Sequence, residues 1–185
     1  MSQAIPLDHA VTFAEWERDW CHREERYEFV DGIPQMVPSE AGPNVRASWE
    51  LGHLIERHTG RELLCYPTFD VVFRPAPFHA RAPDLIVVRA SRAPAGHWVA
   101  PSDVLLAVEV HSPSTRAVDR SAKRAEYATH GIPSYLMIDT RSGHPTLTLL
   151  THPMAGDYTH EVRGEAVTLH LDGHTVDIAA ADLLR

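Results

Sequence analysis

Three charged residues, Asp84, Glu109 and Lys123, lie at positions where packing alone would favour other residue types. Asp84 opens an apolar run directly after a proline, and Glu109 lies inside DVLLAVEV (103–110), the most apolar strand-like segment. A carboxylate in a buried strand is costly unless it is paired or bound to a metal ion. Lys123 is the only lysine beside 16 arginines, and an ammonium, unlike a guanidinium, is compact and can change its pKa. These residue types indicate a site where charge is used chemically.

Each of the three residues also has a purely structural interpretation. Asp84 could be a turn or capping residue at a strand start, and Glu109 could pair with an arginine or bond to a loop. Lys123 lies four residues after Asp119 and would pair with it on a solvated helix face. The apolar stripe of that helix is expected at Val118, Ala122, Ala125 and Thr129. Because Lys123 lies roughly 140° from the centre of that stripe, it is expected to reach a site only past the flank of the helix.

The first half of the chain predicts helices and strands in alternation. A capping-box pattern at Thr12 and Glu15 and helical spacing of aromatic residues predict a helix over 12–26. Asp31 and Gly32 are typical of a tight hairpin turn. The expected elements that follow are strands at 27–30 and 33–37, a helix at 44–59, and strands at 62–66, 69–74 and 84–89. The segments RPAPFHARAP (74–83) and 91–102 are interpreted as loops.

The second half begins with the buried strand 103–110, a helix over about 116–130 and a strand at 134–139. This order is typical of a right-handed βαβ crossover, with the first strand covered on both faces. Short strands at 145–150, 157–162 and 165–170 predict an antiparallel tail, and ADLL (181–184) predicts a last helical turn. We therefore expect one α/β domain, 1–185, with a central mixed sheet flanked by helices.

Composition excludes several classes of protein. The net charge is −8, from 17 basic and 25 acidic residues, so any nucleic acid would have to meet a local arginine patch. The longest apolar stretch, 104–108, is far shorter than a membrane helix, and the first residues lack the features of a secretory signal. Cys21 and Cys65 do not make a disulfide framework, and the 13 histidines lack zinc-site spacing. We therefore expect a soluble, cytoplasmic protein without a membrane partner.

The charged residues also form a pattern that resembles the Uma-type restriction endonuclease family of the PD-(D/E)XK nuclease superfamily. The resemblance rests on PD at 83–84, EVHSPST at 109–115, Asp119, Lys123 and Tyr127, and GIPSYLMID at 131–139. The segment YEFVDGIPQMV at 27–37 resembles the opening hairpin of the family. The likeness keeps the family's order over residues 12–140.

This resemblance implies a restriction-endonuclease-like core with a divalent metal at the open edge of the sheet. Asp84, Glu109 and the backbone carbonyl of Val110 would hold Mg²⁺, or Mn²⁺ in its place, and Glu28 would complete the metal shell. Hard oxygen ligands of this kind are the ones that Mg²⁺ prefers. Lys123 would supply an ammonium that assists the attacking water or the transition state.

Two positions depart from the pattern of the family, and three arginines extend it. His111 occupies the place where the superfamily usually carries its lysine, and we interpret it as a surface residue, with a supplementary base as the alternative. Asn44 stands near a place where the family often has a histidine. The candidate DNA-contacting residues are Arg116, Arg120 and Arg124, with a solvated helix face as the alternative interpretation.

The leading hypothesis is a Mg²⁺-dependent DNA endonuclease that hydrolyses phosphodiester bonds. DNA is then the expected partner, and the two-fold symmetry of duplex cleavage favours a homodimer. One alternative is a non-catalytic nuclease-fold module that binds nucleic acid or protein, which the acidic charge and Asn44 favour. Another is a metal hydrolase that acts on a different phosphoester.

Overall fold

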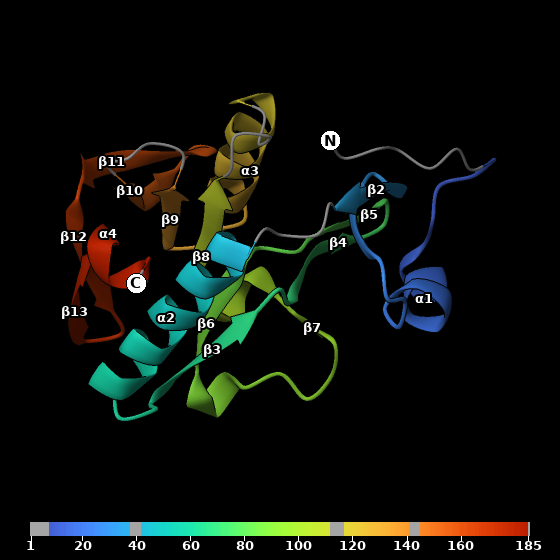
Figure 1. Cartoon of the computed structure of the whole chain (residues 1–185). Helices are drawn as coiled ribbons and strands as arrows, with labels where there is room; N and C mark the ends of the chain where they lie inside the picture. Colours follow the sequence, from blue (N-terminus) through green and yellow to red (C-terminus); the bar gives the residue numbers. More distant parts are fainter. Residues whose placement is uncertain (1–7, 38–41, 112–116, 141–144, 185) are drawn as a thin grey trace.

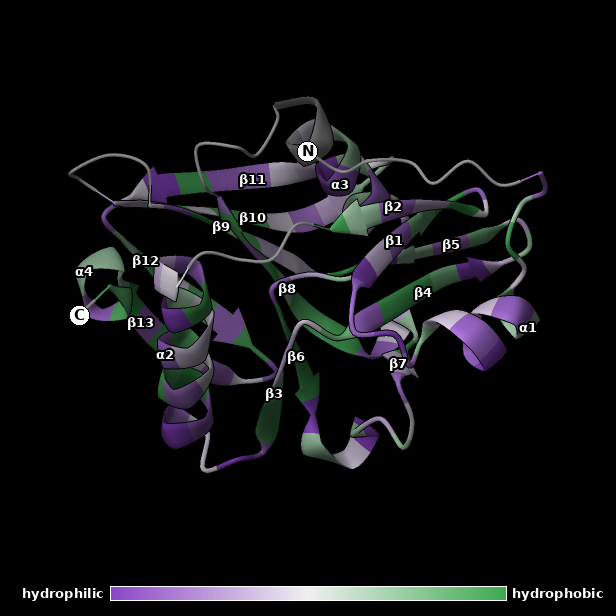
Figure 2. Cartoon of the chain, turned by 45° about the vertical axis from the view of Figure 1, so that its right-hand side comes forward, coloured by the Kyte–Doolittle hydropathy of each residue, from purple (hydrophilic) through white to green (hydrophobic). Residues whose placement is uncertain are grey.

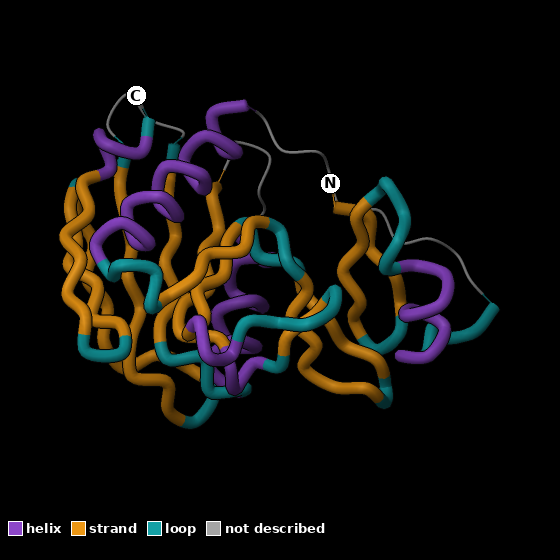
Figure 3. Tube along the Cα trace, turned by 90° about the horizontal axis from the view of Figure 1, so that it is seen from below, coloured by secondary structure: helices purple, strands orange, loops and turns teal. Residues whose placement is uncertain are grey.

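The computed structural model describes residues 8–37, 42–111, 117–140 and 145–184, with the side chains of 117–120 excepted. Its elements form a mixed α/β fold with two main sheets, and the N-terminal helix and the C-terminal hairpin lie at opposite ends of the molecule (Figure 1). Figure 3 shows the same separation from below. The described helices include none that is long and apolar enough to cross a membrane.

The first sheet is built mainly from the N-terminal part of the chain. Its strand order is β2-β1-β5-β4-β7. The bounds are β1 (Arg26–Val30), β2 (Ile33–Val37), β4 (Asp70–Pro75), β5 (Phe78–Arg81) and β7 (Trp98–Val99). The β1–β2 hairpin turns at Asp31 and Gly32, both with positive φ, as the sequence predicts. A Cβ on Gly32 would lie 2.7 Å from Cβ of Ala10, so the close approach also requires glycine there.

The second sheet has six strands and runs through the centre of the molecule. Its order is β11-β10-β9-β8-β6-β3. The bounds are β3 (Leu63–Pro67), β6 (Leu85–Arg89), β8 (Val104–His111), β9 (Ser134–Asp139), β10 (Thr146–Met154) and β11 (Asp157–Gly164). Strands β8 and β9 are parallel and joined through α3 (Ala117–Thr129), which confirms the predicted βαβ order. All eight residues of β8 are buried, as its near-continuous apolar sequence indicates.

Two different layers cover the faces of this central sheet. One face packs against α2 (Gly42–His58), the hairpin β12 (Ala166–Leu171) and β13 (His174–Ala179), and α4 (Ala180–Leu183). The other face packs against α3 and part of the first sheet. Figure 2 shows β6 and β8 as apolar strands between these layers. The sheet is therefore buried on both sides, and a polar side chain on it needs a partner inside the protein.

Four predicted elements differ in the structure. The first helix is short, with α1 at Phe13–Glu15 and a wider π-type turn at Trp16–Trp20, because its aromatic side chains pack onto the sheet at Phe29 and Phe78. The segment expected as a Pro-rich loop contains β5, because the apolar–polar alternation of FHAR spans only four residues and prolines flank it on both sides. The tail contains β13 in addition to the three expected strands. The segment 91–102, also expected as a loop, contains the two-residue strand β7, which is too short to show a pattern in the sequence.

Candidate active site

The site begins with two carboxylates on neighbouring antiparallel strands. Leu85 of β6 lies opposite Val108 of β8, so continuing this register by one residue places Asp84 opposite Glu109. Directly opposite residues of an antiparallel pair share a face of the sheet. An Oδ2 atom of Asp84 accepts a hydrogen bond of 2.5 Å from the backbone N–H of Val110. The sheet therefore brings the two predicted acidic residues together and fixes one of them.

Helix α3 brings the ammonium of Lys123 to the same face. Lys123 Nζ donates to Glu109 Oε1 at 2.9 Å, and the hydroxyl of Tyr127, one turn later, donates to the same oxygen at 2.8 Å. Lys123 is 7% exposed and Tyr127 is fully buried. The side chain of Lys123 therefore points into the protein, and its interpretation as a partner of Asp119 on a solvated helix face was wrong.

The packing face of α3 also differs from the predicted stripe. Tyr127 and Ala128 are buried, whereas Ala125 and Thr129 are exposed. The stripe was inferred from small apolar residues, but the large side chain of Tyr127 has more surface to remove from water. This rotation of the helix places Lys123 on the inner face rather than at the flank.

Glu28 of β1 joins the site from the first sheet. Its Oε1 lies 2.9 Å from Lys123 Nζ, and its Oε2 accepts a hydrogen bond of 2.8 Å from Arg81 Nη1. Arg81 continues to Glu126 of α3 through two hydrogen bonds of 2.6 and 2.7 Å. Glu28, Arg81 and Lys123 are all buried. Five charged groups, including Glu109, thus form one connected network in the interior.

The two carboxylates that share the ammonium differ in pKa. Burial raises the pKa of Glu109 to about 8, with Asp84 and Glu28 adding to the shift and Lys123 opposing it. Burial also disfavours the charge of Glu28, but Lys123 and Arg81 together outweigh it and lower its pKa. One ammonium between two acids therefore favours an ionised Glu28 and a protonated Glu109. A divalent cation beside Glu109 would reverse that preference.

The far end of β8 carries the backbone groups that the sequence assigned to the site. Asn44, near the start of α2, donates through Nδ2 to the carbonyl of Val110 at 3.5 Å. The Oγ1 of Thr140 donates to Asn44 Oδ1 at 3.4 Å and to the carbonyl of His111 at 3.2 Å. His111 is 3% exposed, so its interpretation as a surface residue was wrong. Asn44 is thus a contact of the carbonyl predicted to bind metal.

The three candidate DNA-contacting arginines have different positions. Arg116 lies outside the described residues, and so does the side chain of Arg120. Arg124 is half-buried and its guanidinium donates to Asp157 at 2.6 Å and to Glu161 at 3.0 Å, both on β11. A phosphate at Arg124 would therefore have to compete with two carboxylates of the protein.

The donor set fits Mg²⁺ chemically. Asp84, Glu109 and the Val110 carbonyl offer hard oxygens, and Mg²⁺ is commonly held by one or two carboxylates with several waters. Within the described ranges, no group of three or more His, Cys, Asp and Glu side chains already surrounds one cation position. The residues therefore suit a sparse, water-rich metal site rather than a preformed cage of side chains.

Sequence reasoning missed Arg81 and Glu126. Arg81 lies in the Pro-rich segment that was interpreted as a loop, and Glu126 is one of two acidic residues in the sequence of α3. The nearest sequence signal is the spacing of Lys123, Glu126 and Tyr127, which places all three within one helical turn. The partner of Glu126 comes from β5, whose alternating pattern is only four residues long and is flanked by prolines.

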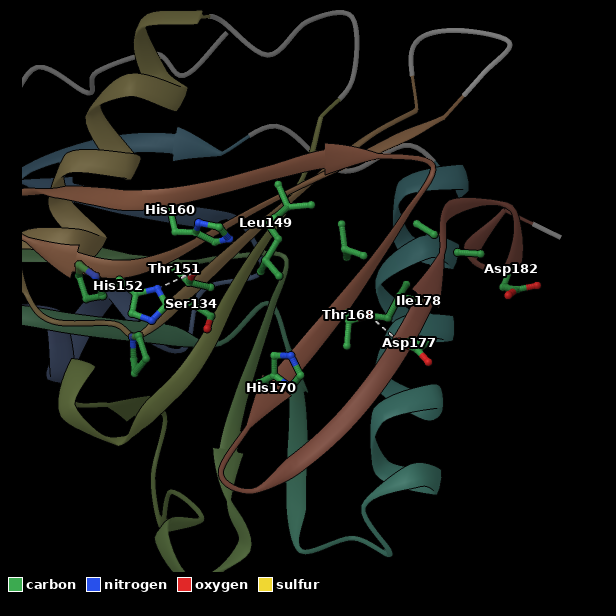
Figure 4. Close-up of a pocket in the computed structure, with 16 residues that line it drawn as sticks. Ser134, Leu149, Thr151, His152, His160, Thr168, His170, Asp177, Ile178 and Asp182 are labelled. Carbon is green, nitrogen blue, oxygen red and sulfur yellow. Dashed lines mark hydrogen bonds between the residues drawn. The ribbon is translucent and has the colours of Figure 1, made fainter.

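A groove of about 950 Å³ lies away from these residues, between β9–β11 and the β12–β13 hairpin. Figure 4 shows His152, His160 and His170 around it. Its residue on β9 is Ser134, at the start of the strand, whereas Glu109 lies opposite Met137. The described site residues do not line this groove, so its volume does not bear on the charged network.

The central mixed sheet with flanking helices, and the acidic residues that meet a lysine on it, define a protein of the restriction-endonuclease-like class. The model of the Uma2 family, described as a putative restriction endonuclease, matches residues 12–179. The chain belongs to this family. A crystal structure of a putative nuclease of the DUF820 group from Anabaena variabilis ATCC 29413 has a TM-score of 0.72 and 16% identity, covering 94% of this chain and 97% of that chain. This similarity shows the shared fold. No curated protein matches the chain.

Proposed function

We propose that the chain is a Mg²⁺-dependent endonuclease that hydrolyses phosphodiester bonds of DNA. The observation that carries this proposal is the position of Asp84 opposite Glu109, with the Lys123 ammonium 2.9 Å from the Glu109 carboxylate. Membership of a nuclease family supports the reaction class. Two acidic residues beside a lysine are also common as purely structural ion pairs, so the family adds support that the residues alone do not give.

Each residue has a proposed role. Asp84, Glu109 and the Val110 carbonyl would hold the cation, which supplies charge neutralisation and a more acidic water when bound. The Val110 N–H fixes Asp84, and Asn44 contacts the Val110 carbonyl from the other side. Lys123 would orient the attacking water or stabilise charge on the phosphate, since its ammonium is buried and fixed beside Glu109.

Plasmid cleavage in the presence and absence of Mg²⁺ tests this function. We expect the wild type to nick or linearise DNA only with the metal, and Glu109→Ala and Lys123→Ala to lose at least about 100-fold in rate. Asp177→Asn is the matched control, because it removes an exposed carboxylate on the C-terminal hairpin, at the other face of the central sheet. Circular dichroism verifies that each variant is folded. Cleavage that persists in both site variants would refute the assignment.

A second candidate is a nuclease-fold module that binds without cleaving. The net charge of −8 and the engagement of Arg124 by two carboxylates favour it. Electrophoretic mobility shifts with a labelled duplex, measured with and without Mg²⁺, separate the two functions. Metal-independent binding with no product would support the module and contradict the enzyme.

A further inference from the structure

Glu28 is surrounded by hydrogen-bond donors and positive charge. We propose that Glu28 is the anchor that positions the Lys123 ammonium, held in turn by Arg81 and Glu126, and that it is not a metal ligand. This inference rests on the proposed nuclease function and assigns positioning roles to Glu28, Arg81 and Glu126. It differs from the expectation of the sequence, in which Glu28 completes the metal shell.

The contacts of Glu28 account for both of its oxygens. Oε1 lies 2.9 Å from Lys123 Nζ and accepts a longer hydrogen bond of 3.4 Å from the backbone N–H of Ala82. Oε2 accepts from Arg81 Nη1 at 2.8 Å. A divalent cation at Glu28 would have to approach a carboxylate already neutralised by two buried cations, and like charges repel strongly in such surroundings. The carboxylate is therefore better suited to holding an ammonium than to binding a metal.

The strand register makes this arrangement rigid. Phe29 of β1 lies opposite Ala80 of β5, so continuing the register places Glu28 opposite Arg81. Arg81 is 3% exposed and forms a two-pronged contact with Glu126, a geometry that fixes the guanidinium plane. Arg81 is therefore held from one side by its strand and from the other by α3.

The chain of contacts closes on α3. Lys123 and Glu126 are three residues apart on the helix and so lie on neighbouring positions of one face. Starting at Lys123, the contacts run to Glu28, then to Arg81, then to Glu126 and back to the helix. A closed ring of this kind holds the ammonium at a set place relative to β1 and β5.

Glu109 has the opposite character. Among the described residues, the two hydrogen bonds to its side chain both reach Oε1, and Asp84 lies opposite on the next strand. Burial and these carboxylates raise its pKa, whereas the pKa of Glu28 is lowered. If Glu109 binds a metal ion, Glu28 would still hold the Lys123 ammonium. The same lysine can therefore pair with Glu109 at rest and remain positioned during the reaction.

The lone lysine provides a direct test. Protein labelled only with ¹³Cε-lysine gives one lysine signal, from Lys123, without any need for activity. We expect Glu28→Gln to shift this signal, to bind Mg²⁺ within about threefold of wild type by calorimetry, and to lower kcat at least about tenfold with KM unchanged. Glu109→Gln is expected to weaken Mg²⁺ binding at least about tenfold. Asp177→Asn, at an exposed position of the C-terminal hairpin on the other face of the central sheet, should change none of these.

Each outcome decides between the two roles of Glu28. A loss of Mg²⁺ affinity in Glu28→Gln of the size seen in Glu109→Gln would make Glu28 a ligand, and an unmoved lysine signal would remove it as an anchor. If Glu28→Gln does not fold, Glu126→Gln leaves Glu28 and Arg81 in place and should give a smaller shift of the same signal; no shift overturns the proposal. A wild type that neither binds Mg²⁺ nor cleaves DNA refutes the proposed function, whereas the lysine signal still decides the anchor.

Discussion

The position of the Lys123 ammonium is set by the two carboxylates beside it. It is the only lysine of the chain, and its ammonium lies between Glu28 and Glu109 at 2.9 Å from each. A small ammonium makes both contacts from one atom, whereas a guanidinium spreads its donors across a plane. The residue type is therefore matched to a narrow space between two carboxylates.

Lys123→Arg tests this match. We expect cleavage to fall at least about 100-fold and the free energy of unfolding to drop by roughly 1–3 kcal/mol, because the larger group must fit a buried position. Initial cleavage rates and urea unfolding measure the two effects. Arg124→Lys is the reverse exchange at the neighbouring position and should keep most of the activity. An arginine variant with wild-type rates would show that the ammonium has no special role.

At the scale of elements, the site depends on pieces that are distant in sequence. The strands β6 and β8 place the two acids, α3 places Lys123, and β1 and β5 place the groups that hold it. The C-terminal hairpin lies on the other face of the central sheet and contributes no site residue, but it covers Leu147 and Leu149 there. Its packing is expected to support the sheet that carries the acids.

Leu169→Ala measures this support. Leu169 of β12 is fully buried in the cluster under the hairpin, and removing its side chain should cost about 2–5 kcal/mol through lost burial and the cavity left behind. Urea unfolding gives the difference. His170→Ala, on the adjacent exposed position, is the control and should change stability by less than about 1 kcal/mol. Equal effects of the two variants would mean that the hairpin does not pack as described.

At the scale of the whole molecule, buried acids oppose folding at high pH. Burial raises the pKa of Asp70 to about 7, with Arg26 opposing the shift and Glu28 adding to it. Burial also raises the pKa of Glu109. Between the usual pKa of such an acid and its raised value, the folded protein holds a proton that the unfolded chain has released. The free energy of unfolding therefore falls as pH rises through that window.

Asp70→Asn should remove part of this pH dependence. We expect the variant to match wild type near pH 4 and to be more stable by roughly 1–3 kcal/mol at pH 8, where wild type must carry a half-buried charge. Urea unfolding at a series of pH values gives the slope. Asp177→Asn, at an exposed position, is the control. A variant that loses stability at pH 8 would show that Asp70 is stabilised as an anion.

The sequence by itself indicated the family, the order of the central elements and the two acids that the structure places opposite each other. Pro83-Asp84 and a glutamate inside an apolar strand are local signals, because burying a charge without purpose is costly. Apolar continuity likewise predicted β8, and the Asp31-Gly32 pair predicted the first hairpin.

The tertiary structure decided which partners those charges have. The rotation of α3 followed from the packing of Tyr127 against the sheet, and it turned Lys123 inward. Arg81 reaches Glu28 only because β5 pairs with β1, although the two residues are 53 positions apart in the sequence. Pairing energies between distant strands depend on the assembled core, and a single sequence carries no local pattern for them.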